Sequence, residues 1–95
     1  MNNNILIPDR HASMMQKVIA LLYENGFVNT KGVLTNHEVH HELLTNNYGI
    51  FIIGGGVDDE TRIMIRRLIT DNNIQIKLVE HFGNAEKLIE EISEH

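Results

Sequence analysis

Charged and imidazole side chains follow two apolar segments of this chain, and they are the residues best suited to chemistry. They are Asp9, Arg10, His11, Glu80 and His81. A carboxylate beside an imidazole can exchange protons near neutral pH. An arginine fork can bind an anion. The pattern permits a ligand site for an anion or nucleotide. The favoured alternative is a set of solvated loop residues with a surface ion pair, Asp9–Arg10 or Glu80–Arg10, worth about 0–1 kcal/mol.

Three glycines, Gly54, Gly55 and Gly56, separate the apolar run Tyr48–Ile53 from the acidic segment Asp58–Glu60. Glycines let the backbone approach a phosphate at the start of a helix. Neither a G-x-G-x-x-G fingerprint nor a P-loop lysine accompanies them. The acidic residues would repel a phosphate and themselves complement the helix dipole. A tight strand-to-helix turn is the favoured interpretation, and ligand contact by the glycines is the alternative.

Histidines at positions 37, 40 and 41 have the spacing of metal ligands on a helix. We expect Val39, Leu43 and Leu44 to form the buried stripe of this helix. A metal site would also need a ligand from another element. We therefore predict no metal and no cofactor. His37 and His41 are the only weak candidates for metal ligands.

The elements that position these residues follow from the apolar pattern. Strands are expected at residues 4–7, 27–34, 48–53 and 74–79, with Pro8 ending the first and Gly32 disrupting the second. Helices are expected at residues 12–25, from the cap Thr35 or Asn36 to Thr45, from the cap Asp58 to about Thr70, and after the cap Asn84. Alternating strands and helices predict a parallel sheet with helices on both faces. The expected fold is a small doubly wound three-layer α/β/α sandwich of four parallel strands in the order 2-1-3-4, of the flavodoxin type.

The composition sets outer limits on function. Ninety-five residues predict a single domain over residues 1–95. A net charge of −5 and few aromatic residues argue against binding to nucleic acid. There is no cysteine, signal-peptide pattern or membrane-length apolar run, so we expect a cytoplasmic protein. Arg62, Arg66 and Arg67 are expected to form a solvated helix face.

The order of segments resembles a response-regulator receiver domain over roughly residues 4–83. The matching pieces are Ile5–His11, the helix end Ala20–Gly26, and the strand Tyr48–Ile53 that ends at Gly54. The family's phosphoryl acceptor is an aspartate at the end of the third strand, where this chain has Gly54. Glycine carries no nucleophile, so an aspartyl phosphate cannot form at that position.

The rest of the family's phosphorylation chemistry is also incomplete in this sequence. The acidic pair that holds magnesium is reduced to Asp9, with Arg10 beside it. The Glu80-His81 region replaces the small hydroxyl residue expected after the fourth strand. The lysine at the end of a fifth strand has no counterpart. The resemblance therefore implies a degenerate, pseudo-receiver domain.

We therefore expect a non-enzymatic, receiver-like module that works by protein contact. A fourth strand at the sheet edge, Ile74–Val79, would leave backbone groups unpaired and available to a partner or to a second copy. The alternative is a ligand-binding protein or small enzyme that uses the strand ends around Asp9, Gly54 and His81.

Overall fold

The structure, a computed structural model, describes residues 3–8, 12–54, 57–81 and 87–93. Strands and helices alternate along the chain. In order they are β1 (Ile5–Pro8), α1 (Ala12–Glu24), β2 (Thr30–Val33), α2 (Asn36–Thr45), β3 (Ile50–Gly54), α3 (Asp59–Asp71), β4 (Lys77–His81) and α4 (Leu88–Ser93). All pairs of neighbouring strands are parallel, and the sheet order is β2-β1-β3-β4. The predicted fold class and strand order are confirmed.

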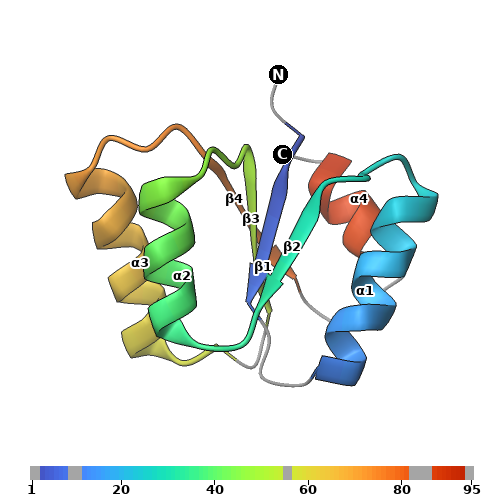
Figure 1. The fold of residues 1–95 in the computed structure, drawn as a ribbon, viewed down its shortest axis with the longest axis horizontal. Helices are drawn as coiled ribbons and strands as arrows, with labels where there is room; N and C mark the ends of the chain where they lie inside the picture. Colours follow the sequence, from blue (N-terminus) through green and yellow to red (C-terminus); the bar gives the residue numbers. More distant parts are fainter. Residues whose placement is uncertain (1–2, 9–11, 55–56, 82–86, 94–95) are drawn as a thin grey trace.

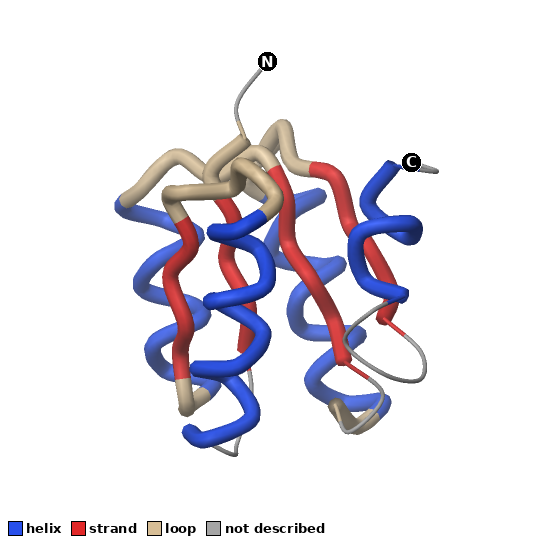
Figure 2. Tube along the Cα trace, turned by 90° about the vertical axis from the view of Figure 1, so that its right-hand side faces the viewer, coloured by secondary structure: helices blue, strands red, loops and turns tan. Residues whose placement is uncertain are grey.

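The sheet forms the middle of three layers. Helices α2 and α3 cover one face, and α1 and α4 cover the other (Figure 1). The four strands lie side by side, with β2 and β4 at the two edges (Figure 2). In the sheet order β2-β1-β3-β4, the chain moves toward the β2 edge when it passes from β1 to β2. It moves toward the β4 edge when it passes from β2 to β3 and from β3 to β4. Right-handed connections therefore place α1 on the opposite face from α2 and α3.

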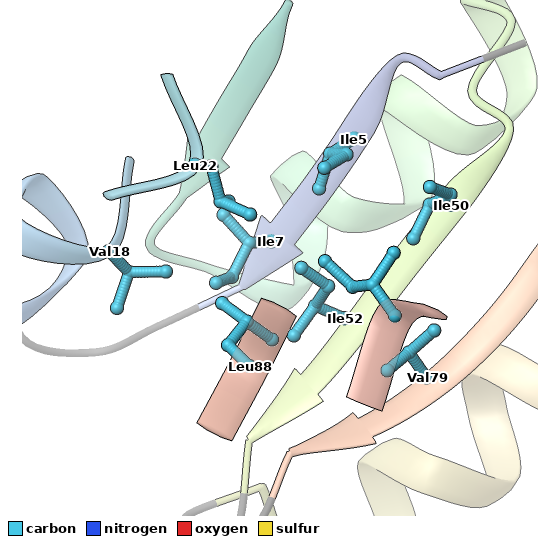
Figure 3. Close-up of a cluster of buried hydrophobic side chains, with 9 residues drawn as sticks. Ile5, Ile7, Val18, Leu22, Ile50, Ile52, Val79 and Leu88 are labelled. Carbon is cyan, nitrogen blue, oxygen red and sulfur yellow. The ribbon is translucent and has the colours of Figure 1, made fainter. Parts of the chain in front are cut away.

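Each face of the sheet buries its own apolar cluster. The cluster under α1 and α4 is shown in Figure 3. Its buried members are Ile5, Ile7, Val18, Leu22, Ile50, Ile52, Val79, Leu88 and Ile92. The cluster under α2 and α3 contains Leu6, Val33, Val39, Leu43, Phe51, Ile53 and Ile65. Because strand side chains alternate between faces, consecutive residues of β1 and β3 enter opposite clusters. The sequences of β1 and β3 are continuously apolar because both faces of these strands are buried.

Side-chain caps fix the starts of the two helices on the α2–α3 face. The Thr35 hydroxyl accepts a hydrogen bond from the backbone N–H of Glu38 at 3.2 Å, at the start of α2. The Asp58 carboxylate accepts one from the N–H of Thr61 at 2.8 Å, at the start of α3. Both caps satisfy N–H groups that have no partner within the helix. They confirm the predicted starts of these helices.

The bounds of β4 differ from the prediction. It covers Lys77–His81 instead of Ile74–Val79, so Glu80 and His81 belong to the strand and do not follow it. Its first residue pairs with Ile50, where β3 begins, and the apolar residues before Lys77 have no strand opposite them. Ile74 and Ile76 instead pack at the border of the α2–α3 cluster.

Two smaller expectations were also wrong. Leu44 is 47% exposed and is no part of the buried stripe of α2. Gly32 does not interrupt β2, which covers Thr30–Val33. A Cβ atom at Gly32 would lie 1.9 Å from the Met15 sulfur, so a larger residue there would force the Met15 side chain of α1 to move. No helix in the described part of the chain is both long enough and apolar enough to cross a bilayer.

Candidate functional site at the ends of β3 and β4

The ends of β3 and β4 bring three of the predicted site residues together. Gly54 stands opposite His81 in the sheet register, and Ile53 stands opposite Glu80. The side chains of Glu80 and His81 point to opposite faces, because neighbouring strand residues alternate. Glu80 contacts α3 and His81 contacts α4. The other predicted site residues (Asp9, Arg10, Gly55 and Gly56, with neighbouring His11) lie outside the described residues.

Arg62, in the first turns of α3, lies at the centre of this site. Its Nη1 forms an ion pair with Oε1 of Glu80. Its Nη2 donates to the carbonyl oxygen of Gly54 and its Nε to that of Val57, each at 3.3 Å. The side chain is 19% exposed. All three guanidinium nitrogens therefore have acceptors within the protein, and no free fork remains to hold an anion.

The prediction that Arg62 belongs to a solvated face was therefore wrong. Helix α3 starts directly beyond the end of β3, so its first turns lie over the ends of β3 and β4. Arg66, one turn further along, has an Nη2 atom 3.6 Å from Glu80 Oε1, and its side chain is 59% exposed. Glu80 thus pairs with two arginines of α3. The sequence shows an arginine four residues after the cap Asp58, in the first turns of the helix. It does not show that Glu80 is the partner of this arginine.

His81 is joined to α4 by a hydrogen bond to Glu91. The His81 Nδ1 and Glu91 Oε1 atoms lie 2.5 Å apart, and the two side chains are 14% and 17% exposed. An ionised carboxylate only accepts, so the proton of this bond belongs to Nδ1 and, in the neutral ring, Nε2 is the free acceptor. The bond orients the imidazole and links β4 to the helix that follows it. Sequence reasoning missed Glu91.

The structure has room for a side chain at position 54. A Cβ atom built there meets no heavy atom within 4 Å. Among the described glycines only Gly26 has a positive φ. Neither packing nor backbone conformation therefore requires glycine at position 54.

The charges of this site balance. Arg62 and Arg66 carry two positive charges, and Glu80 and Glu91 carry two negative ones. The charged side chains in these contacts therefore leave no excess positive charge to attract a phosphate. Two separate contacts, Arg62 with Glu80 on one face and His81 with Glu91 on the other, fasten α3 and α4 to the strand ends.

The histidines of α2 were the sequence-based candidates for a metal site. His37 and His41 are exposed. Across residues 3–8, 12–54, 57–81 and 87–93, no three or more His, Cys, Asp or Glu side chains gather closely enough to hold a metal ion. His40 borders a cavity of about 350 Å³ on the α2–α3 side. The cavity is lined by His40, Glu60, Ile63, Met64, Arg67, Leu68 and Asp71.

Two solved structures that are similar to this chain are receiver domains. The receiver domain of the Francisella response regulator 1452 matches with a TM-score of 0.63 at 21% identity, covering 95% of this chain and 75% of that structure. A CheY-like response regulator receiver domain protein from Methanospirillum hungatei JF-1 matches with a TM-score of 0.66 at 12% identity, covering 99% and 93%. No protein-family model and no curated protein sequence matches this chain. At these identities the likeness establishes architecture, and the chain has the fold of response-regulator receiver domains.

Proposed function

We propose that this chain is a receiver-like module that is not phosphorylated and that acts by contact with another protein chain. The observation that carries the proposal is Gly54. It ends β3, opposite His81 of β4, at the position where the resemblance places the phosphoryl-accepting aspartate. A glycine offers only backbone atoms there, and an acyl phosphate needs a side-chain carboxylate.

The surroundings of Gly54 support the same conclusion. Its carbonyl oxygen accepts a hydrogen bond from Arg62, and the Arg62–Glu80 ion pair lies beside it. These contacts join α3 to β3 and β4. A domain held in this way presents one arrangement of its strand ends to a partner.

The edge of the sheet supports contact with another protein chain. Within the described residues, β4 pairs with β3 alone. Native sheets cover, twist or pair such edges, because unpaired backbone groups recruit other strands. We propose that β4, with the helices beside it, forms the contact with a partner or a second copy.

Incubation with acetyl phosphate and Mg²⁺ tests the first part of this proposal. A receiver carboxylate would attack the phosphorus atom, form a C–O–P bond and release acetate. We expect the intact mass of the wild-type chain to stay unchanged. The comparison variant is Gly54→Asp, whose side chain the open space beside β3 can accept. A phosphoryl group gained by the wild type would overturn the proposal.

A thermal-shift screen separates this proposal from the ligand-binding alternative. Its probes are ATP, GTP, inorganic phosphate, Mg²⁺ and Ca²⁺. A ligand that binds only the folded state raises the Tm. We expect none of these probes to raise it. An increase that disappears in both Arg10→Ala and His81→Ala would establish a strand-end ligand site instead.

A further inference from the structure

We infer that the partner at β4 is a second copy of this chain, whose β4 pairs antiparallel with Val79 opposite the partner subunit's Val79. The inference rests on the proposed function, because it identifies the partner for the contact at β4. It joins two four-stranded sheets into one of eight strands.

The register of β4 determines which backbone groups face outward. The Lys77 N–H donates to the Gly49 carbonyl oxygen at 2.9 Å, so Lys77 directs its backbone groups toward β3. In a parallel pair, alternate residues of a strand bond to the same neighbour. Val79 and His81 therefore also face β3. The N–H and C=O groups of Leu78 and Glu80 face the outer edge of β4, where no described strand lies, at one side of the sheet (Figure 2).

Antiparallel pairing about Val79 uses all of these outward groups. Leu78 then stands opposite the partner subunit's Glu80, and Glu80 opposite the partner subunit's Leu78. Each of these two pairs can exchange two N–H···O bonds. Val79 is the middle residue of Lys77–His81, so this register overlaps the two strands over their full length.

The side chains fit this register without opposing like charges. Lys77 comes opposite the partner subunit's His81, whose Nδ1 is bonded to a carboxylate of α4, so a cation meets an imidazole–carboxylate pair. Leu78 comes opposite a Glu80 that already has Arg62 as its counter-ion. A shift that centres the pairing on Glu80 would place two Glu80 carboxylates opposite each other, which is unfavourable.

Closure of the assembly favours β4 over β2 as the partner strand. Pairing of β4 with the β2 edge of another copy would be heterologous, and each added copy would again offer a free β4 edge to the next β2, so the assembly would not close. Pairing of β4 with β4 is two-fold symmetric and closes at two chains. Closed two-fold dimers are the commonest soluble homo-oligomers.

Sedimentation velocity of Leu78→Pro and Leu78→Ala tests the inference. Proline removes the outward N–H of residue 78 and leaves the bonds to β3 intact, as proline on an edge strand does. Alanine removes the same side chain and keeps the N–H. We expect the wild type and Leu78→Ala to sediment as dimers at high micromolar concentration, and Leu78→Pro to sediment as a monomer. A dimer that persists in Leu78→Pro would overturn the inference.

Amide hydrogen exchange on the wild type gives a readout that needs no variant. We expect exchange at Leu78 and Glu80 to slow as protein concentration rises, while Val79, bonded to β3, stays protected at every concentration. Concentration-independent exchange at Leu78 and Glu80, or a wild-type monomer, would refute self-pairing. Neither result would alter the acetyl phosphate experiment, so the two proposals can fail separately.

Discussion

Arg62 on α3 and Glu80 on β4 form an ion pair across 18 positions of the chain. The pair joins a helix to the edge strand of the sheet. The same guanidinium reaches the carbonyl oxygen of Gly54, so β3, α3 and β4 share one side chain as a common contact.

Replacing Arg62 with alanine should destabilise the fold. The change removes the ion pair with Glu80 and the hydrogen bonds to the carbonyl oxygens of Gly54 and Val57, in a partly buried site. Loss of a buried partner costs about 1–3 kcal/mol. Arg66→Ala is the matched control, since Arg66 is 59% exposed and exposed pairs contribute about 0–1 kcal/mol. Urea unfolding measures both, and equal losses in the two variants would contradict the central role of Arg62.

Gly32→Ala should also destabilise the fold, through α1. The new methyl group would meet the Met15 sulfur at 1.9 Å and Cδ1 of Ile19 at 3.2 Å. Overpacking of this kind costs about 1–3 kcal/mol.

Gly54→Ala is the matched control for Gly32→Ala, because open space surrounds that position, and its effect should stay within about 0.5 kcal/mol. The double variant Gly32→Ala/Met15→Ala should lose less stability than the sum of the two single losses, since mutations at contacting sites are not additive. Strictly additive urea-unfolding free energies would show that Met15 is not the obstacle.

Acid should weaken the contact between Tyr48 and Glu42. The Tyr48 hydroxyl donates to Glu42 Oε1 at 2.5 Å, and this bond is the largest cause that lowers the pKa of Glu42. Burial, followed by the bond to Glu42, raises the pKa of Tyr48 and keeps its hydroxyl protonated. A carboxylate with a lowered folded-state pKa stabilises the fold above its ordinary pKa of about 4.3, and the contribution is lost as pH falls through the folded-state pKa.

Tyr48→Phe should therefore reduce the unfolding free energy by about 0.5–1.5 kcal/mol at neutral pH. Its difference from the wild type should shrink as the pH falls from about 5 to about 3. Tyr23→Phe is the control, because Tyr23 is 63% exposed, and it should match the wild type throughout. A Tyr48→Phe difference that does not change with pH would contradict the expected linkage.

Glu91→Ala should loosen α4. It removes the acceptor that holds the Nδ1 proton of His81, in a contact where both side chains are largely buried. We expect a loss of about 1–3 kcal/mol in urea unfolding. Glu90→Ala makes the same change of residue type at an exposed position of the same helix, and its effect should be near zero. Equal effects would mean that helix propensity explains the loss.

Much of the fold could be predicted because the apolar pattern is strong where the sheet is buried on both faces. The runs that contain β1 and β3 have no polar interruption, and turn residues separate them from amphipathic helices. The start of β4 was less predictable. Ile74 and Ile76 are apolar because they pack at the border of a cluster, although no strand lies opposite them.

The candidate site was only partly predictable, since its contacts depend on three-dimensional register. Gly54, Glu80 and His81 follow from the rule that parallel strands end at one edge. The roles of Arg62 and Glu91 depend on which turn of α3 or α4 lies over that edge. The charged residues around Arg62 in the sequence are as consistent with a solvated Arg62 side chain as with one that pairs with Glu80.

The position of α4 on the same face as α1 has a further consequence. Helix α4 returns along the sheet and ends at the end of the molecule where β1 begins (Figure 1). A short linker could connect these two points, and new termini could be opened in the exposed turn at Asn72 and Asn73. Circular permutation is tolerated at such turns. The permutant would keep both apolar clusters, and β4, the last strand of this chain to be synthesised, would be synthesised first.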